Sequence, residues 1–396
     1  MIKSLKPILT SSLVNQVQTP PIDEALNWLD DDLHHHDAGS FFDLAQAAPD
    51  YPPPDDMLDY LADVVKTGHA FRYTPILGLI SLRDALAEHM SDDYKASVNP
   101  CEVAITAGCN QAFAVTMKAL VEPGSEVLLT SPYYFNHKMW LDMEGINSVL
   151  MPLNSDHGFV ASARDAETLI TPNTKAIVLV TPGNPTGATV PPDELLRFYQ
   201  LAKSLGITLI LDETYKDFRA DNAPAHNLFN QPDWQNTLVQ IYSFSKVYSL
   251  AGYRVGSIVA GENVLSEIAK VLDCVAICPS HIGQLAALYG IQHLDLWRRA
   301  NRGMMLDRAG VMKSSFADPD LSYQLHSLGA YFAYVQHPFD DELSEIVARR
   351  LAGDYNLLCL PGSIFGPHGE HYLRFSYANL EQRSMLDVVR RLIDSQ

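Results

Sequence analysis

Long apolar runs are missing from this sequence of 396 residues. No stretch has the length of a membrane-spanning helix, and Thr10, Ser11 and Ser12 interrupt the N-terminal segment before a secretory core forms. Cysteine is scarce as well. The five cysteines are odd in number and never spaced as CxxC, so we expect reduced and mostly buried thiols. These absences favour a cytoplasmic protein without membrane segments.

Basic residues are too few for a nucleic-acid-binding protein. The chain has 28 Lys and Arg against 47 Asp and Glu, a formal net charge of -19, and no basic cluster. Binding phosphodiesters requires a basic surface, so we expect no nucleic-acid partner. The triplet His34, His35 and His36 lacks the spacing and the carboxylate companions of a metal site. We expect it to be a solvated surface run, and we expect no bound metal.

An alternation of helix-like and strand-like segments dominates the rest of the chain. Amphipathic stretches of helix length alternate with short apolar runs bounded by Gly, Pro or Asp. Strands separated by helices predict a mostly parallel sheet covered by helices on both faces. The expected strands are 102–106, 125–130, 176–181, 207–212, 238–243 and 256–261. The expected helices are 56–66, 80–91, 110–121, 193–205 and 281–294.

The same pattern divides the chain into three parts. Proline and acidic residues crowd residues 1–55, which we interpret as an N-terminal arm and the start of a small domain. Residues 56–294 form the expected large domain. Residues 295–396 have their own alternation of helices and strands. The sequence therefore predicts an α/β protein with a large domain and a smaller α/β domain.

Polar segments follow the ends of the expected strands. They are TAGCN at 106–110, SPYYFN at 131–136, TPGNPTG at 181–187, LDETY at 211–215 and SFSKVYSLAGYR at 243–254. The carboxyl ends of parallel strands lie along one edge of a sheet, where ligands bind. We therefore expect these five segments to converge on one crevice.

The chemistry of these segments indicates a phosphorylated ligand that also carries a positive charge. Lys246 follows an apolar strand, with Ser243 and Ser245 beside it and Arg254 downstream, and hydroxyls with a guanidinium suit a phosphate. The TAGCN turn opens a helix-like segment whose free N–H groups favour the same anion. Asp212 ends an apolar strand, where a carboxylate is costly unless it meets a cation such as a protonated pyridine nitrogen.

Six motifs stand in an order typical of one enzyme family. They are Y-x-P-x-x-G at 73–78, T-x-G at 106–108, P-G-N-P-T-G at 182–187, D-E-x-Y at 212–215, S-x-S-K with G-Y-R-x-G at 243–256, and P-G-S-x-F-G with L-R-F-S at 361–376. On these motifs the chain resembles, from about residue 41 to its end, the class I/II aminotransferase family of fold type I pyridoxal-phosphate enzymes. The resemblance implies the cofactor pyridoxal 5'-phosphate, a large cofactor-binding domain, and amino transfer from an amino acid to a 2-oxo acid.

The resemblance also implies catalytic roles. Lys246 would bind the cofactor as a Schiff base and, once displaced by the substrate, would move the proton between Cα and the cofactor. Asp212 would keep the pyridine nitrogen protonated. Tyr215 and Asn184 would hydrogen-bond the phenolic oxygen of the cofactor, and Asn184 would also lie at the substrate.

Further matching residues would hold the cofactor and the substrate. Tyr134 would stack on the pyridine ring, with its neighbour Tyr133 as the alternative. Arg374 would bind the substrate α-carboxylate through a bidentate pair. Tyr73 would reach the phosphate of a neighbouring subunit, which implies a homodimer with shared active sites. The phosphate itself would be bound by side chains or N–H groups of Gly108, Cys109, Asn110, Ser243, Ser245 and Arg254.

Two positions depart from the family pattern. Ala47 stands where many relatives have a glycine whose amide approaches the substrate carboxylate, so we expect a slightly tighter pocket or a backbone set further back. Asn110 replaces a lysine that reads the side-chain carboxylate in many relatives that act on aspartate, which argues against a dicarboxylic donor. The rings of Tyr133, Tyr134 and Phe135 leave a neutral or aromatic donor open.

Other functions remain alternatives at this point. The same scaffold carries Cβ–S lyases and other Cα and Cβ reactions, which a sequence separates poorly. A transcription regulator with this fold would need a helix-turn-helix domain, and the acidic, proline-rich N-terminal residues have no such pattern. A dinucleotide-dependent dehydrogenase would need G-x-G-x-x-G, which the sequence lacks. We predict an aminotransferase of amino-acid metabolism, with the lyase as the alternative.

Overall fold

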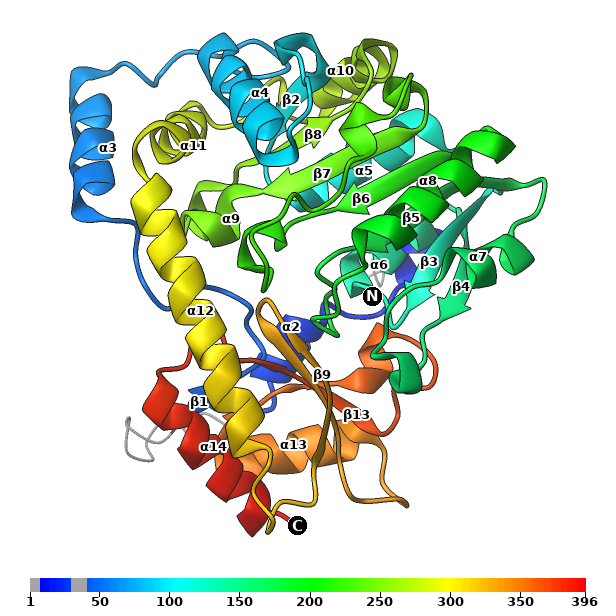
Figure 1. Ribbon diagram of the computed structural model, residues 1–396, viewed down its shortest axis with the longest axis vertical. Coiled ribbons are helices and arrows are strands. Elements are labelled where there is room, and N and C mark those ends of the chain that lie inside the picture. The colour runs from blue at the N-terminus through cyan, green and yellow to red at the C-terminus, as the bar shows by residue number, and fades with distance from the viewer. Residues whose placement is uncertain (1–7, 30–40) are drawn as a thin grey trace, which may run out of the picture.

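A seven-stranded sheet forms the centre of the computed structural model, which describes residues 8–29 and 41–396 (Figure 1). Its strand order is β2-β8-β7-β6-β5-β3-β4. The strands from β7 to β4 are parallel, and β8 is antiparallel to both of its neighbours. The predicted mostly parallel sheet is therefore confirmed. The strands are β2 (Val103–Thr106), β3 (Glu126–Ser131), β4 (Asn147–Pro152), β5 (Thr174–Val180), β6 (Thr208–Asp212), β7 (Leu238–Ser243) and β8 (Gly256–Val259).

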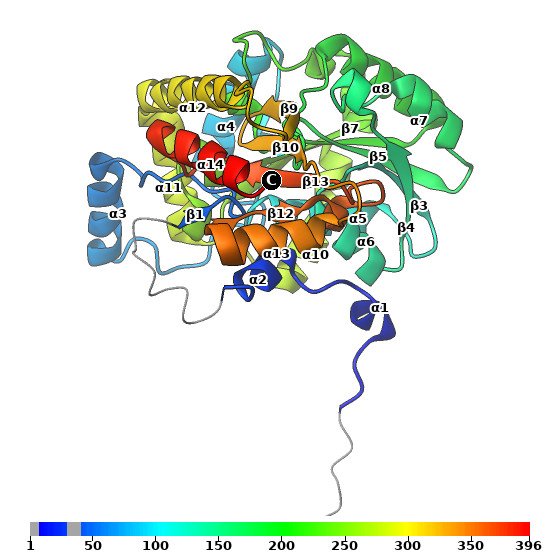
Figure 2. The ribbon, with the colours of Figure 1, turned by 90° about the horizontal axis from the view of Figure 1, so that it is seen from below.

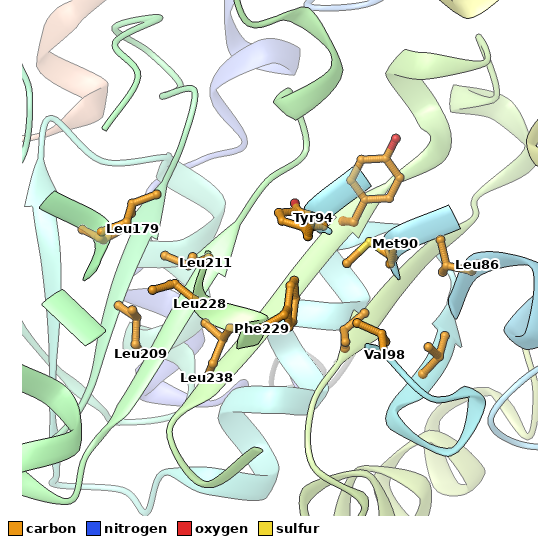
Figure 3. Packing of buried hydrophobic residues seen from close by; sticks show 14 of the residues in the cluster. Leu86, Met90, Tyr94, Val98, Leu179, Leu209, Leu211, Leu228, Phe229 and Leu238 are labelled. Carbon is orange, nitrogen blue, oxygen red and sulfur yellow. The ribbon is translucent and has the colours of Figure 1, made fainter. Parts of the chain in front are cut away.

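Helices cover both faces of this sheet because the strand side chains alternate between two apolar cores. In β5, Ile177 and Leu179 join the core shared with α4, α8 and α11, which is seen from close by in Figure 3. Ala176 and Val178 point the other way, into the core shared with α5 and α10. The helices around the sheet are α3 (Asp55–Thr67), α4 (Ile80–Tyr94), α5 (Cys109–Leu120), α6 (Phe135–Met143), α7 (Ala163–Leu169), α8 (Pro192–Leu205), α9 (Phe244–Val247), α10 (Glu262–Ala276) and α11 (His281–His293).

A second, antiparallel sheet of four strands has a core of its own. Its order is β12-β13-β10-β9, and Figure 2 shows it between α13 on one side and α12 with α14 on the other. The long helix α12 runs from the region of the large sheet to this second sheet (Figure 1). The elements are α12 (Asp295–Ser315), β9 (Gln324–Gly329), β10 (Phe332–Gln336), α13 (Ser344–Tyr355), β12 (Leu360–Pro361), β13 (Tyr372–Ser376) and α14 (Gln382–Asp394).

The N-terminal arm joins the C-terminal part of the chain. Its helices α1 (Ser12–Asn15) and α2 (Pro21–Leu26) are short, and β1 (Phe42–Asp43) pairs in parallel with β11 (Leu357–Leu358). Helix α12 begins where the second domain is expected to start, although the domain division itself stays a prediction. The expected solvated run at 34–36 lies outside the described residues.

The described residues contain no helix that is long and apolar enough to cross a membrane. In the same part of the chain, no three His, Cys, Asp or Glu side chains gather as metal ligands.

The cysteines correct one expectation. The sequence predicts mostly buried thiols, but only Cys109 and Cys359 are buried, whereas Cys101 and Cys274 are exposed and Cys278 is half-buried. Cys101 lies in a turn before β2, and Cys274 lies in α10, whose buried side is formed by other residues. Apolar sequence neighbours therefore do not predict on which side of a helix a residue lies.

Candidate active site

A cavity of about 150 Å³ lies at the carboxyl ends of β5, β6 and β7. It is lined by Cys109, Asn110, Tyr134, Val180, Asn184, Asp212, Thr214, Tyr215, Ser243, Ser245, Lys246 and Arg254. Apart from Val180 and Thr214, each of these is a residue that the sequence places in the site. The five polar segments therefore converge on one crevice, as the sequence predicts.

Among the predicted site residues, Gly108, Ala47 and Tyr73 do not line the cavity, and they lie at different distances from it. Gly108 precedes α5 at the edge of the cavity, and the carbonyl of Ala47 accepts a hydrogen bond from Lys246 Nζ. Tyr73 is 77% exposed and does not line the cavity. The structure thus brings Gly108 and Ala47 to the site and leaves Tyr73 at the surface of this chain.

Lys246 lies in α9, directly after β7, so the end of the strand places its amine in the cavity. Burial lowers the pKa of Lys246 to about 8, and the positive charges of Arg374 and Arg254 act in the same direction. A lysine with such a pKa is partly uncharged near neutral pH and can act as a nucleophile or a base.

A group of anion-binding features lies beside this lysine. Gly108 has φ +86°, and a Cβ added there would lie 2.5 Å from Arg254 Nη2, so the backbone and the guanidinium approach closely. Arg254 donates to the Ala251 carbonyl at 3.0 Å, which fixes its direction. The Ser243 and Ser245 side chains line the same cavity, and the first N–H groups of α5 have no acceptor within the helix. Hydroxyls, a guanidinium and a helix N-terminus together suit a phosphate.

Asp212 ends β6 and is 4% exposed. Its Oδ1 accepts from Thr214 N at 3.0 Å, and its Oδ2 lies 3.3 Å from His137 Nε2. Burial alone would raise the pKa of Asp212, but the hydrogen bonds and the charge of His137, together with Thr214, hold it below its usual value. The cavity therefore contains a carboxylate that stays ionised and suits a cationic ring nitrogen.

His137 is a residue of this site that the sequence does not reveal. It lies on the buried side of α6, and its ring stacks on Phe113 of α5 with a centroid distance of 3.9 Å and an interplanar angle of 19°. It directly follows the polar segment 131–136, and this position in the sequence is the one feature that could have indicated a site residue. Without a predicted helix at α6, nothing indicates that this side chain points toward Asp212.

Tyr134 and Tyr133 have different surroundings. Tyr134 lines the cavity, accepts from Asn136 Nδ2 at 2.9 Å, and lies 3.4 Å from Asn110 Oδ1 through its hydroxyl. Tyr133 instead packs against Gly366, where its ring would lie 2.9 Å from an added Cβ. Of the two tyrosines, only Tyr134 lines the cavity.

Arg374 lies on β13 of the second sheet and is only 1% exposed. Its Nη1 donates to Asn184 Oδ1 at 3.1 Å and its Nη2 donates to the Ala45 carbonyl. The buried Nε has no hydrogen-bond partner among the residues that the structure describes. Burial lowers the pKa of Arg374 to about 10, so the guanidinium remains charged at neutral pH. This residue suits a carboxylate that arrives from the cavity.

Comparisons with known proteins agree with this geometry. Residues 40–392 match the family described as aminotransferase class I and II. The chain is 30% identical to a putative aminotransferase, YugH, from Bacillus subtilis, over 78% of this chain and 80% of that protein. It is 28% identical to the aromatic aminotransferase ISS1 of Arabidopsis thaliana, over 88% of each chain, and 27% identical to an aspartate aminotransferase of Sulfolobus acidocaldarius, over 87% of each.

Among solved structures, an aspartate aminotransferase from Thermus thermophilus with maleate superimposes with a TM-score of 0.89. The alignment covers 98% of this chain and 100% of that chain at 22% identity, and at this identity it shows the fold. The family match spans most of the chain, and the solved structures show the same fold. The chain therefore belongs to the class I and II aminotransferases, enzymes that use pyridoxal 5'-phosphate to move amino groups between amino acids and 2-oxo acids.

Proposed function

We propose that this enzyme takes its amino group from an L-amino acid without a second carboxylate, that is, from a neutral or aromatic donor. Amino transfer with pyridoxal 5'-phosphate follows from family membership. The proposal adds the class of donor and the role of each residue in the cavity.

Asn110 is the observation that carries the choice of donor. Its neutral side chain lines the cavity beside Tyr134. Lys246 and Arg254 line the cavity, Arg374 lies next to it and donates to the lining residue Asn184, and the roles proposed below occupy all three cations. In the described part of the chain, no further Lys or Arg lines the cavity, so a second carboxylate would be buried without a cation at considerable cost. The relatives' names include both aromatic and aspartate aminotransferases and do not decide between the two classes.

The test is a comparison of kcat/KM for single donors, with L-phenylalanine and L-leucine against L-aspartate and L-glutamate. The neutral donors should be favoured by about tenfold or more, because a hydrogen bond to a charged group contributes about 1.5–3 kcal/mol where its partner is present. The variant Asn110→Lys should raise kcat/KM for L-aspartate relative to L-phenylalanine. A wild-type enzyme that prefers L-aspartate would contradict the proposal.

The residues of the cavity fit the cofactor. Gly108 has no side chain, so Arg254 lies close to the start of α5. The first backbone N–H groups of α5, together with Ser243 and Ser245, would hold the phosphate. Asp212 would face the pyridine nitrogen as an ionised carboxylate. The bound cofactor supplies an electron sink for negative charge at the substrate Cα.

The protein's own groups would orient the substrate and move its proton. Arg374 would bind the α-carboxylate, with Asn184 fixing the guanidinium at 3.1 Å. Lys246 Nζ, which its pKa of about 8 leaves partly uncharged near neutral pH, would take the proton from Cα. Burial, and to a smaller extent the nearby Tyr134, hold the pKa of Tyr215 well above its usual value. The phenol of Tyr215 therefore stays protonated and would donate a hydrogen bond to the cofactor's phenolic oxygen.

Gly108→Ala is expected to weaken cofactor binding by about tenfold, which corresponds to about 1.4 kcal/mol. Its new Cβ would lie 2.5 Å from Arg254 Nη2 and would displace the guanidinium from the phosphate. Gly124→Ala is the matched control, because Gly124 has φ +85° and an added Cβ there meets nothing within 4 Å. Titration of the apoprotein with cofactor measures both variants. Equal weakening in the two would mean that backbone strain alone explains the effect.

We also propose a homodimer in which Tyr73 reaches the phosphate bound by the neighbouring subunit. Its 77% exposure in the single chain leaves it available for such a contact. Sedimentation should give a dimer, and a fully active monomer would contradict the proposal. The cytoplasmic location stays a prediction from the sequence.

A further inference from the structure

Residues 44–51, called the strap below, pass the side of the cavity where Arg374 lies. The Ala45 carbonyl accepts from Arg374 Nη2, and the Ala47 carbonyl accepts from Lys246 Nζ. Lys246 of α9, which follows the large sheet, and Arg374 of β13 in the second sheet thus contact one short segment of the N-terminal arm. The position of the strap therefore bears directly on the direction of the Arg374 guanidinium.

The N-terminal end of the strap is fixed by backbone bonds to β11 and to β13 of the second sheet. Leu44 N donates to the Leu358 carbonyl at 2.7 Å, and Ser376 N donates to the Leu44 carbonyl at 2.8 Å. Asp43 Oδ1 accepts from Ala45 N at 2.8 Å and turns the chain away from the strand. This end of the strap is therefore bonded to β13, the strand that carries Arg374.

The C-terminal end is fastened to helix α12 instead. Arg308 Nη1 and Nη2 donate to the two carboxylate oxygens of Asp50 at 3.0 and 2.9 Å. Arg308 is 5% exposed, and its Nη1 also donates to the Ala378 carbonyl. Next to this pair, the Tyr51 ring meets Trp297 of α12 edge-on, with a centroid distance of 5.6 Å.

We infer that Asp50 and Arg308 are positioning residues, which hold the strap so that Ala45 aims the Arg374 guanidinium at the substrate α-carboxylate. A bidentate pair between planar groups fixes direction as well as distance. Without this pair, the strap beyond Leu44 would keep the contacts of Ala47 with Lys246 and of Tyr51 with Trp297. The Ala45 carbonyl would lose this support on the C-terminal side, and the direction in which it holds the Arg374 guanidinium would be less well fixed. The inference rests on the proposed role of Arg374 as the α-carboxylate ligand.

The test uses Asp50→Asn and Arg308→Lys, which remove the bidentate geometry in two independent ways. In each variant kcat/KM for the amino donor should fall by about ten- to a hundredfold through a higher KM, because small displacements of an orienting group have effects of this size. The affinity for pyridoxal 5'-phosphate, measured by titration of the apoprotein, should not change. If one variant does not fold, the other carries the test.

A second arginine–carboxylate pair, in which one guanidinium nitrogen contacts both oxygens, provides the control. Arg350 Nη1 donates to both oxygens of Glu342 at 3.0 and 2.7 Å, and neither residue belongs to the strap or lines the cavity. Glu342→Gln and Arg350→Lys should lower the melting temperature without raising KM. An unchanged KM in both strap variants, or an equal rise in KM in the control variants, would overturn the inference.

Arg374→Lys separates this inference from the proposed function. Its own KM should rise strongly, and combining it with Arg308→Lys should add little, because the two residues act through one contact. If Arg374→Lys leaves KM unchanged, the carboxylate role of Arg374 is wrong. If Arg374→Lys raises KM and the effects of the two substitutions are fully additive, Arg374 keeps its role and the strap inference is wrong.

Discussion

Lys246→Ala is expected to abolish amino transfer, with kcat lower by about ten-thousandfold or more, since one side chain supplies both the nucleophile and the proton carrier. The buried amine with a pKa of about 8 would be lost from the centre of the cavity. Two measurements check this. Borohydride reduction of the wild type followed by peptide mass analysis should find the cofactor attached to Lys246, and kcat should fall as stated in the variant.

Lys246→Arg and Lys216→Met are the controls for this substitution. Arginine keeps the positive charge but cannot replace the amine, so Lys246→Arg should be as inactive as Lys246→Ala. Burial lowers the pKa of Lys216, but Asp93 and Asp217 outweigh this and raise it, and the residue lies outside the cavity. Lys216→Met should lose stability and retain amino transfer. A cofactor attached to Lys216, or a Lys246→Ala variant with normal turnover, would refute the assignment.

Asp212→Asn is expected to lower kcat by about a hundred- to a thousandfold, because it removes the charge that stabilises the protonated ring nitrogen. An amide keeps the size of the side chain and can still accept from Thr214 N. His137→Phe should have a smaller effect in the same direction, because His137 Nε2 lies 3.3 Å from Asp212 and helps to keep the carboxylate ionised. Steady-state kcat with a fixed donor measures both.

Glu213→Gln tests whether any buried carboxylate of this segment would behave in the same way. Glu213 is fully buried beside Asp212 in the sequence, but it bonds Gln240 at 3.0 Å and also Tyr94, and it does not line the cavity. This variant should unfold at lower temperature and keep kcat near the wild-type value. A loss of kcat as large as that of Asp212→Asn would contradict the proposed role of Asp212 at the ring nitrogen.

The central sheet and most of the residues that line its cavity could be predicted because they depend on local patterns. Apolar runs marked six of the seven strands, and the polar residues that follow β5, β6 and β7 had to meet at one edge. Strand β4 was missed because it lies at the edge of the sheet and only one of its six residues is buried.

The residues that were missed act over long separations in the chain. His137 reaches Asp212 only because α6 turns its buried side toward the strand end. Asp50 and Arg308 are 258 positions apart, and no spacing or motif relates them. Such pairs follow from how the arm and α12 pack in three dimensions, which periodicity along the chain does not encode.

A single-turnover experiment tests the central claim most directly. The purified holoenzyme is mixed with one L-amino acid in the absence of any 2-oxo acid, and its absorbance and products are followed. We predict that the visible band of the bound cofactor is lost, that one 2-oxo acid forms per active site, and that adding a 2-oxo acid restores the band. If the band persists while ammonia and a 2-oxo acid accumulate, the enzyme is a lyase on the same scaffold, and amino transfer is contradicted.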